Sequence, residues 1–333
     1  MKKGLSLAVA ILMLLSVIIC GLSSAAASAE KEDKDIVIAV IPQQLGNVVF
    51  LPAKQGMEDM GEKLGIKVEW QAPIRAEATE QVGIVESLIE RGVDGIAISC
   101  TTPEALHDVL VRAMNQGIHV STYDADSPDC GRAFFAGTNN YQAGFICGQE
   151  MIRLFEDSGL EKVRVAQLEG IPGAYDIQER MRGFADAIAG TNIEVIYSGP
   201  CDDDVDKAIE VIEAYTRANA GNIDAWYMAG GWPYVVNPDA TPEVNKWKEA
   251  DPVRKVVTLD VFPSSIAFFD RGLIDVAVGQ DFYSMGALSV ENLYKLIKGQ
   301  EIDTVDDPVL GKVIDTGVQM VYPENYKTEI TPE

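Results

Sequence analysis

The chain has 333 residues, of which 47% are hydrophobic, and it carries a formal net charge of −24. A chain of this length fits two domains of ordinary size with well-buried cores, and its composition excludes a disordered protein. The charge excludes nucleic acid as a partner, because no cluster of lysine or arginine offsets phosphate, and it disfavours anionic lipid surfaces.

The first 29 residues have the composition of a signal peptide. A positively charged start precedes an apolar stretch that ends at about Ile19, and small residues follow. Ala27-Ser28-Ala29 has the A-x-A pattern of a cleavage site, which predicts cleavage after Ala29 and a mature protein outside the cytoplasm. Two alternatives stay open. One is a lipoprotein acylated at Cys20, which the preceding Ile19 disfavours, and the other is an uncleaved anchor, for which the apolar stretch is short.

From residue 36 onward, short apolar runs alternate with amphipathic stretches, several of which begin at proline and end at glycine. In chain order, the first half predicts strands at 36–42, 67–73, 95–99 and 118–124, with helices at about 50–64, 79–92 and 103–117. The second half predicts strands at 163–170, 193–200, 225–230, 256–260 and 274–280, helices at 175–189, 204–219, about 242–250 and 284–299, and then an irregular tail. This alternation predicts right-handed βαβ units, and so many units predict two parallel sheets.

Two of the predicted strands end alike. Residues 118–124 and 255–261 are similar apolar segments, and each carries an aspartate, Asp124 or Asp260, at its carboxyl edge. Ligands of open parallel sheets bind in the crevice at the carboxyl ends of strands. Two domains that face each other with these edges would bring both aspartates to one cleft.

Familiar catalytic signatures are missing. The sequence has no G-x-G-x-x-G, P-loop, H-E-x-x-H or G-x-S-x-G motif, and neither His107 nor His119 has a matching nucleophile. Acid–base catalysis by two carboxylates stays open, because acidic residues are plentiful. A glycosidase would need the two carboxyl groups at a defined separation.

Two acidic segments match a calcium loop only in part. In 201–213, three aspartates and the last glutamate fit the pattern, but Lys207 stands where the loop needs glycine. We interpret these acids as caps of a helix N-terminus. The segment DADSPD (124–129) fails the same test, with Asp129 at the glycine position. No metal site is predicted.

Two further segments have both a structural and a ligand-binding interpretation. The glycines of GGWPY (230–234) would let the backbone approach a ligand on which Trp232 stacks, and the alternative is a turn with a partly buried tryptophan. In QERMRGF (178–184), one of Arg180 and Arg182 could reach the cleft while the other faces solvent.

Cysteine usage gives no support to zinc or redox sites, because none of the five cysteines lies in a CxxC pair. Among the four cysteines of the mature chain, a disulfide between Cys100 and Cys130 is the first candidate. The alternative is that all four are small buried hydrophobes.

Several motifs in register resemble the type I periplasmic sugar-binding proteins of ABC importers, the class that includes the ribose-binding protein. The resemblance covers about residues 35–320. It rests on Phe50 to Gly56 followed by KLG, on Tyr123-Asp124, and on GTNNYQAG (137–144), LEGIPGAYDIQERMRGF (168–184), VVTLD (256–260) and GQ (279–280).

The resemblance implies an α/β fold of two doubly wound, parallel-sheet (Rossmann-like) domains, joined by a multi-strand hinge with the ligand cleft between them. The implied lobes are 30–138 plus 281–317 and 139–280 plus 318–333, after a signal peptide at 1–29.

The resemblance also implies which residues bind the sugar. Asp124 and Asp260 match the carboxylates that accept sugar hydroxyls, and Arg180 matches the cleft arginine, which leaves Arg182 in solvent. Asp126 is a second ligand contact or, alternatively, only a turn residue. The full set of implied ligand-binding residues is Gln43, Asn47, Phe50, Asp124, Asp126, Arg180, Trp232, Asp260 and Gln280.

The sequence departs from the ribose-binding pattern at four other positions. Ala125 replaces an arginine that often follows the first aspartate, and Val49 replaces a second stacking phenylalanine. Asp203 replaces an aromatic residue, and Gly230 replaces an amide. These departures disfavour ribose itself but not a small neutral sugar or sugar alcohol.

The implied function is that of an extracytoplasmic, periplasmic solute-binding protein. It would close about its hinge on a pentose, hexose or sugar alcohol and deliver it, as a monomer without a cofactor, to a membrane permease with its ATPase. Such a protein breaks no bond, so it is not an enzyme. The alternatives are a sugar receptor for chemotaxis or a sensor kinase, and a secreted carboxylate-dependent glycoside hydrolase. A lactose-repressor-type regulator is excluded, because the signal peptide occupies the place of its helix-turn-helix.

Overall fold

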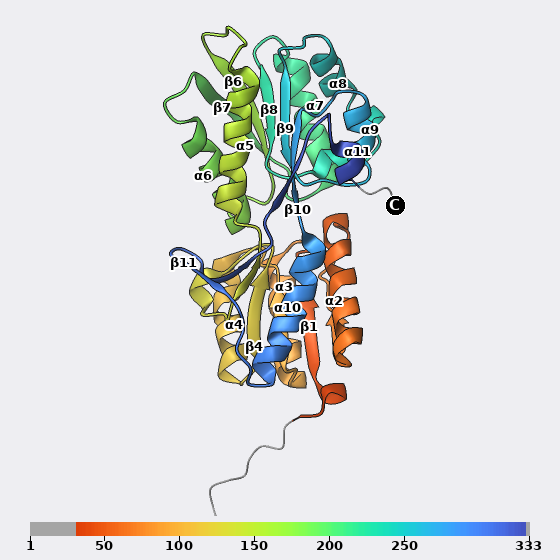
Figure 1. Cartoon of the computed structure of the whole chain (residues 1–333), viewed down its shortest axis with the longest axis vertical. Helices are drawn as coiled ribbons and strands as arrows, with labels where there is room; N and C mark the ends of the chain where they lie inside the picture. The colour runs from red at the N-terminus through yellow and green to blue at the C-terminus, as the bar shows by residue number, and fades with distance from the viewer. Residues whose placement is uncertain (1–30, 331–333) are drawn as a thin grey trace, which may run out of the picture.

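The computed structural model describes residues 31–330 and consists of two α/β lobes stacked along its long axis (Figure 1). Each lobe is built on one mostly parallel sheet, and the strand orders are β11-β12-β5-β4-β3-β1-β2 and β13-β10-β9-β8-β6-β7. The prediction of two doubly wound parallel-sheet domains is confirmed. The predicted signal peptide, its cleavage site and Cys20 lie outside the described residues.

The first lobe contains the seven-stranded sheet. Its strands are β1 (Val37–Ile41), β2 (Lys67–Trp70), β3 (Gly95–Ile98), β4 (His119–Tyr123), β5 (Phe135–Gly137), β11 (Val305–Asp307) and β12 (Gly311–Asp315). Its helices are α2 (Leu51–Leu64), α3 (Ala78–Arg91), α4 (Pro103–Asn115) and α10 (Phe282–Ile297), with short 3-10 helices η1 (Asp33–Asp35), η2 (Val48–Phe50) and η3 (Pro128–Cys130).

Alternate residues of β1 show why helices cover both faces of this sheet. Ala39 and Ile41 pack into the apolar cluster under α3 and α4, whereas Ile38 and Val40 pack into the cluster under α2 and α10. Successive side chains of a strand point to opposite faces, so an almost continuous apolar strand needs a helical layer on each side.

The second lobe contains the six-stranded sheet. Its strands are β6 (Val163–Glu169), β7 (Ile193–Pro200), β8 (Ala225–Met228), β9 (Lys255–Leu259), β10 (Val276–Gln280) and β13 (Val318–Val321). Its helices are α5 (Asn140–Phe155), α6 (Tyr175–Ile188), α7 (Val205–Asn219), α8 (Pro242–Glu249), α9 (Ser265–Asp270) and α11 (Tyr326–Glu329), with η4 (Trp232–Tyr234) and η5 (Pro238–Ala240).

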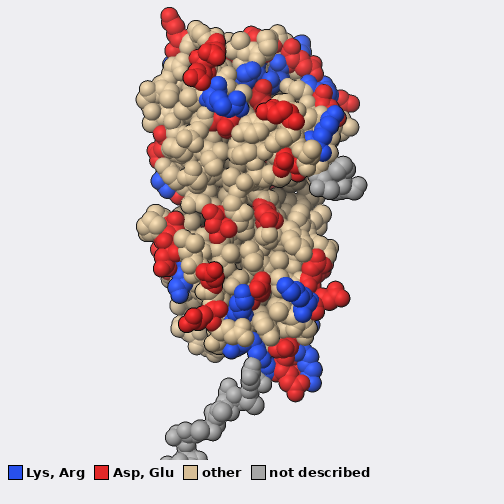
Figure 2. All heavy atoms as spheres, in the orientation of Figure 1, with Lys and Arg blue, Asp and Glu red and all other residues tan. Residues whose placement is uncertain are grey.

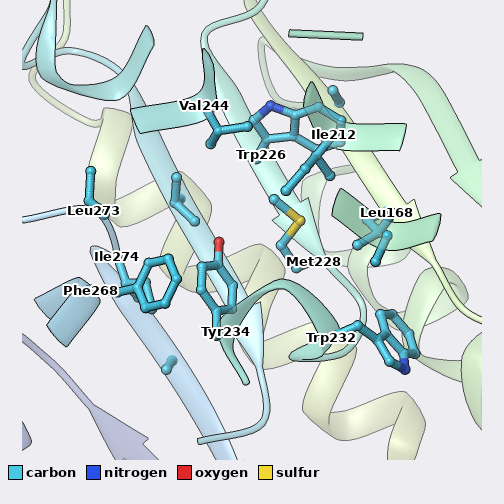
Figure 3. Packing of buried hydrophobic residues seen from close by; sticks show 14 of the residues in the cluster. Leu168, Ile212, Trp226, Met228, Trp232, Tyr234, Val244, Phe268, Leu273 and Ile274 are labelled. Carbon is cyan, nitrogen blue, oxygen red and sulfur yellow. The ribbon is translucent and has the colours of Figure 1, made fainter. Parts of the chain in front are cut away.

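One apolar cluster of this lobe extends to the edge that faces the other lobe. Trp226 and Met228, on the same face of β8, pack in it, and the same cluster includes Trp232 just past the end of that strand (Figure 3). The loop after β8 is therefore anchored by its own tryptophan.

The chain passes between the lobes after β5, after β10 and after β12, and these three passages lie side by side within the described residues. Thr138 Oγ1 donates to the Gly317 carbonyl at 3.1 Å, and the Thr316 N–H donates to the Gly137 carbonyl at 3.1 Å. Gln280 is paired with residue 318 in the antiparallel ladder of β10 and β13.

The prediction of an irregular tail is wrong, because the segment after α10 forms β11, β12, β13 and α11. The short strands of this tail add to the edges of both sheets. The sequence patterns also missed β5, α5 and α9.

On the face seen in Figure 2, acidic and basic side chains are interspersed over both lobes and do not form a single basic patch. Within residues 31–330, none of the helices has the length and apolar character that crossing a membrane requires.

Candidate functional site

A small pocket lies where the two lobes meet. The structure brings together in its wall all of the residues predicted to bind ligand except Asp126. The lining residues are Gln43, Asn47, Val49, Phe50, Asp124, Asp176, Ile177, Arg180, Asp203, Trp232, Asp260, Gln280 and Phe282.

Asp124 enters the pocket from the first lobe, directly after β4. Its backbone is left-handed, with a φ of 57°, and its Oδ2 accepts a hydrogen bond from Ser99 Oγ at 2.7 Å. Burial raises the pKa of this carboxyl to about 7, and the neighbouring Asp176 adds to the rise, while Arg180 and the Ser99 hydrogen bond oppose it. Asp124 is thus a buried acceptor that lacks full charge compensation.

Asp260 enters the pocket from the second lobe, directly after β9, and also has a left-handed backbone, with a φ of 65°. The Gly231 N–H donates to its Oδ2 at 2.9 Å, and Gln280 Nε2 donates to its Oδ1 at 2.7 Å. These two donors fix the orientation of the carboxylate. The buried Oε1 of Gln280 has no hydrogen-bond partner within the described chain.

Arg180 lies on α6 and is almost completely buried. Its Nε donates to Asn140 Oδ1 at 2.8 Å, and its Nη1 donates to the Ala229 carbonyl at 2.9 Å. Its Nη2 is 3.8 Å from Asp176 Oδ2. Two nitrogens of the guanidinium therefore form hydrogen bonds that hold the side chain in place, and the third lies near the carboxyl group of Asp176.

Glycines bring α5 and α6 close enough to fix the position of this arginine. A Cβ at Gly144 would overlap the backbone carbonyl of Arg180, and a Cβ at Gly183 would overlap the carbonyl of Tyr141. The two helices touch through their backbones at these positions, which leaves α6 little freedom to shift.

Aromatic side chains complete the wall of the pocket. The Phe50 ring meets those of Tyr123 and Phe282 edge to face, with centroids 6.3 Å and 6.0 Å apart. The buried side chain of Trp232 belongs to the second lobe and lines the same pocket. These rings supply an apolar surface beside the polar groups.

The glycines near Trp232 have a different role from the predicted one. A Cβ at Gly170 or Gly230 would overlap the indole ring, so these two glycines make room for the tryptophan. The Gly231 N–H is bonded to Asp260. These three glycines, from the loops after β6 and β8, therefore shape the pocket wall through Trp232 and Asp260.

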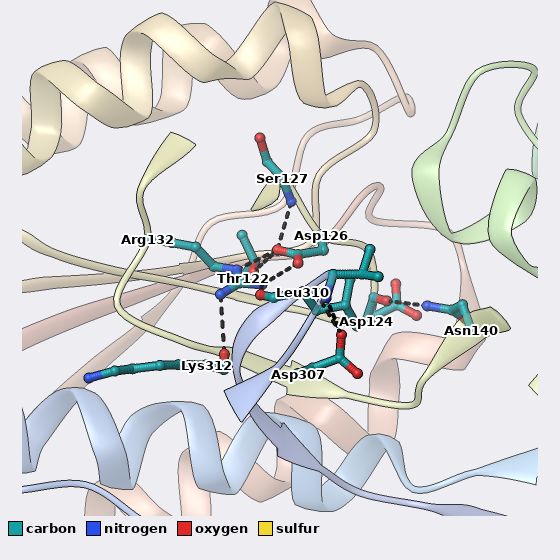
Figure 4. Close-up of polar contacts among 10 residues, drawn as sticks. Thr122, Asp124, Asp126, Ser127, Arg132, Asn140, Asp307, Leu310 and Lys312 are labelled. Atoms are coloured by element: carbon teal, nitrogen blue, oxygen red, sulfur yellow. Dashed lines mark hydrogen bonds and ion pairs between the residues drawn. The ribbon is translucent and has the colours of Figure 1, made fainter. Parts of the chain in front are cut away.

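The structure separates Asp126 from the pocket that contains Asp124, and its prediction as a ligand-binding residue is not supported by this placement. Its carboxylate forms a buried, two-point ion pair with Arg132, whose Nε donates to Oδ1 at 2.6 Å, and it also accepts from Thr122 Oγ1 (Figure 4). Arg132 donates further to the carbonyls of Leu310 and Lys312 at 2.8 Å and 3.2 Å. Asp126 thus anchors the loop after β4 to the β11–β12 turn.

Asp176 and Asp203 line the pocket, although the sequence analysis did not select either as a site residue. Asp176 is in the first turn of α6, and Asp203 has a left-handed backbone, with a φ of 57°, in the loop after β7. Asp204 caps α7 by accepting from the Lys207 N–H, as the capping interpretation predicted. Asp203, one residue earlier, stands where the ribose-binding pattern has an aromatic residue. The structure shows that it turns away from the helix and into the pocket.

The structure also places Asn47 and Gln43, which the sequence predicts to bind ligand, and Arg182, which it predicts to face solvent. Asn47 Oδ1 caps η2 by accepting from the Val49 N–H at 3.1 Å, although the residue lines the pocket as predicted. Arg182 is exposed and lies over the Tyr141 ring, so its prediction as the solvent-facing arginine is confirmed. Gln43 is buried, and its Nε2 donates to the Cys100 carbonyl at 3.4 Å.

The disulfide suggested for Cys100 and Cys130 is wrong. Both are free thiols in the same apolar cluster under α3 and α4, and Cys147 and Cys201 are likewise free and buried. The four cysteines pack as small hydrophobic side chains. Among residues 31–330, no group of three or more histidine, cysteine or acidic side chains is arranged to hold a metal ion.

Two α/β lobes joined by three chain passages, with a cleft lined from both sides, have the architecture of type I periplasmic binding proteins. The chain belongs to the periplasmic binding protein domain family, whose profile matches residues 38–301.

Known relatives share this architecture. A ribose import binding protein of Haemophilus influenzae is 25% identical over 303 residues, which cover 91% of this chain and 96% of the relative. A xylose/arabinose-binding protein of Sulfolobus acidocaldarius is 25% identical over 298 residues, covering 84% of this chain and 69% of the relative. The crystal structure of an ABC transporter solute-binding protein from Burkholderia graminis, in complex with D-arabinose, superimposes with a TM-score of 0.79 at 31% identity, covering 90% of this chain and all of the other.

Proposed function

We propose that the protein binds a small sugar or sugar alcohol between its lobes and delivers it to an ABC permease. The observation that carries this proposal is the convergence of Asp124, Asp260 and Arg180 on one buried pocket with aromatic walls. Carboxylates and a guanidinium form charge-assisted hydrogen bonds with hydroxyl groups, and rings cover the apolar face of a sugar. The ligands in the names of the relatives, ribose, xylose, arabinose and D-arabinose, support the same class.

In this proposal the two lobes move relative to each other. The first lobe, residues 30–138 and 281–317, closes on the second lobe, residues 139–280 and 318–333. Gln44 Nε2 of the first lobe donates to the Asp203 carbonyl of the second lobe at 3.3 Å. This bond spans the cleft and is lost when the lobes separate. Hinge closure around a ligand shields it from water and creates the shape that a permease recognises.

The remaining parts of the proposal follow from this mode of action. The protein is exported by its signal peptide, works in the periplasm as a monomer, and meets a permease with its ATPase at the membrane. It releases its ligand unchanged, so it is a binding protein and not an enzyme.

The experiment is calorimetry on the mature protein with a panel of pentoses, hexoses and sugar alcohols. At least one member should bind, and Asp124→Ala and Asp260→Ala should each abolish that binding, whereas the exposed Asp157→Ala should not change it. If both cleft variants keep wild-type affinity for every responsive ligand, the site is wrong. Release of a hydrolysis product from a glycoside would contradict a pure binding function.

A further inference from the structure

The pocket between the lobes has more acidic side chains than basic side chains to pair with them. Four carboxyl groups line it, those of Asp124, Asp176, Asp203 and Asp260. Arg180 is the one cationic residue of the described chain in its wall, and no lysine or histidine of that part lines it. Buried charges normally have partners, because an uncompensated charge in a low-dielectric interior is costly.

The unsatisfied polar atoms of the wall are all acceptors. Asp176 Oδ1, Asp203 Oδ1 and Gln280 Oε1 are buried and have no hydrogen-bond partner among the described residues. Asp176 and Asp203 are themselves only 5% and 7% exposed. A ligand that satisfies these atoms must therefore bring several hydrogen-bond donors.

Part of the Arg180 guanidinium already forms hydrogen bonds within the protein. Its Nε and Nη1 are bonded to Asn140 and to the Ala229 carbonyl, and its Nη2 is 3.8 Å from Asp176 Oδ2. Burial raises the pKa of Asp203 well above its usual range, with Asp176 and Asp124 adding to the rise, and burial also raises the pKa of Asp176. Arg180 lowers the pKa values of both carboxyl groups, but not enough to cancel the rise.

Asp203 lies beside an aromatic ring. A Cβ placed on Gly170 would overlap both Asp203 Oδ1 and the indole of Trp232, so the carboxyl oxygen and the ring edge share one small space. A buried carboxylate is a favourable partner for an ammonium group, which gains from charge-assisted hydrogen bonds.

We propose that the ligand is an amino sugar or an amino polyol, whose ammonium group binds at Asp203 and Asp176 beside Trp232. The rest of the molecule is held by Asp124, Asp260 and Arg180 as in the proposed function, on which this inference rests. An ammonium supplies three donors and a positive charge, whereas a hydroxyl supplies one donor and no charge. The neutral sugar expected from the sequence brings no positive charge to match the four acidic groups of the wall.

The test compares amines with their hydroxyl counterparts on the mature wild-type protein by calorimetry. The probes are glucosamine against glucose, galactosamine against galactose, and amino-deoxy sugar alcohols against the parent alcohols, with N-acetylglucosamine as an uncharged control. We expect an amine to bind roughly tenfold or more tightly than its hydroxyl counterpart, since charge-assisted hydrogen bonds are about twice as strong as neutral ones.

The variants Asp203→Asn and Asp176→Asn should each remove most of this preference. Asp204→Asn is the matched control, because it deletes the neighbouring charge while asparagine still caps α7. Thermal unfolding of each variant checks that it is folded, and the comparison of ligands on the wild type stands without any variant.

The outcomes separate the two proposals. A neutral sugar that binds as tightly as its amine overturns the amine inference and leaves the proposed function intact. If no probe of either kind binds, the proposed function fails and the inference fails with it. A preference for amines that persists in both Asp203→Asn and Asp176→Asn also overturns the assignment of the ammonium to these residues.

Discussion

Asp124 and Asp260 occupy equivalent positions in the two lobes. Each follows the last residue of a parallel strand, β4 or β9, and each has a left-handed backbone, with φ values of 57° and 65°. Each backbone N–H donates to a residue of the next strand, Asp124 to the Ala136 carbonyl at 3.3 Å and Asp260 to the Val278 carbonyl at 2.9 Å. The same turn therefore presents a carboxyl group to the cleft from both sides, and aspartate tolerates this backbone better than most residues.

The raised pKa of Asp124 predicts how the ligand-free protein responds to pH. The folded chain holds the proton up to about pH 7, whereas the usual value is 3.8, so the folded state binds more protons between these values. Stability must then fall as pH rises through this interval. Asp124→Asn should raise the unfolding free energy near pH 8, with an upper limit of about 4 kcal/mol from the size of the shift.

Thermal unfolding of wild type and Asp124→Asn at about pH 8 and about pH 5 measures this effect. The stabilisation should shrink at the lower pH, where the wild-type carboxyl is mostly protonated. The exposed Asp157→Asn serves as the control and should show no such dependence. An equal change at both pH values would rule out charge burial as its cause.

The Asp126–Arg132 pair predicts a loss of stability without a loss of binding. Asp126→Ala leaves a buried guanidinium unpaired, which typically costs about 3–5 kcal/mol. Because Asp126 does not line the pocket that contains Asp124 and Asp260, the affinity of the folded variant for any ligand of the wild type should stay within about threefold. Chemical denaturation and calorimetry on the same sample measure the two effects.

A double-mutant cycle supplies the control for this prediction. Removing both partners in Asp126→Ala/Arg132→Ala should cost less than the sum of the single changes, because no unpaired charge remains. Full additivity would mean that the pair is not coupled.

The contact between α5 and α6 makes Gly144 a sensitive position. In Gly144→Ala the new methyl group collides with the Arg180 carbonyl, so α6 must move and the guanidinium moves with it. We expect a stability loss of about 1–3 kcal/mol together with weaker ligand binding. Gly83→Ala is the matched control, since Gly83 lies inside α3 with open space around it. It should stabilise the protein by about 0.5–1 kcal/mol and leave binding unchanged.

The hydrogen bond from Gln44 to the Asp203 carbonyl predicts a modest effect on closure. Its removal in Gln44→Ala should weaken ligand binding by about 2- to 12-fold, the range that a net hydrogen-bond energy of about 0.5–1.5 kcal/mol gives. Calorimetry measures the loss, and Gln55→Ala, on the exposed side of α2, is the control. Unchanged affinity would show that this bond does not favour the closed form.

The sequence predicted most of the fold because apolar periodicity, prolines and glycines mark its elements. The helix predicted at 284–299 corresponds to α10, Phe282–Ile297, and glycine ends α2 and α3 as expected. Helix α5 was not predicted because Gly144 and Gly148 interrupt its apolar pattern. In the structure these glycines allow the close contact between α5 and α6. The strands of the tail were not predicted because most of their residues are exposed or only partly buried, unlike the buried strands of the two sheet centres.

The candidate site was predictable only where a residue follows a recognisable strand or lies in a motif. Asp124 and Asp260 satisfy this condition, and both line the pocket. Asp126 shares the same motif, but Arg132 folds back through η3 to neutralise it, and spacing alone does not reveal that pairing. Asp203 lies in a run of acids that cap a helix. Its place in the ribose-binding pattern hinted at the cleft, but its role depends on a backbone turn that the pattern does not reveal.

The three passages between the lobes have a consequence for how the chain folds as it is made. The first lobe receives α10, β11 and β12 from residues 282–315, which the ribosome adds after almost all of the second lobe. A chain that ends before Phe282 lacks the helix that packs against α2 and lies over β4. The N-terminal lobe therefore cannot be completed first, as it would be in two domains joined in tandem, and both lobes reach their final form only near the end of synthesis.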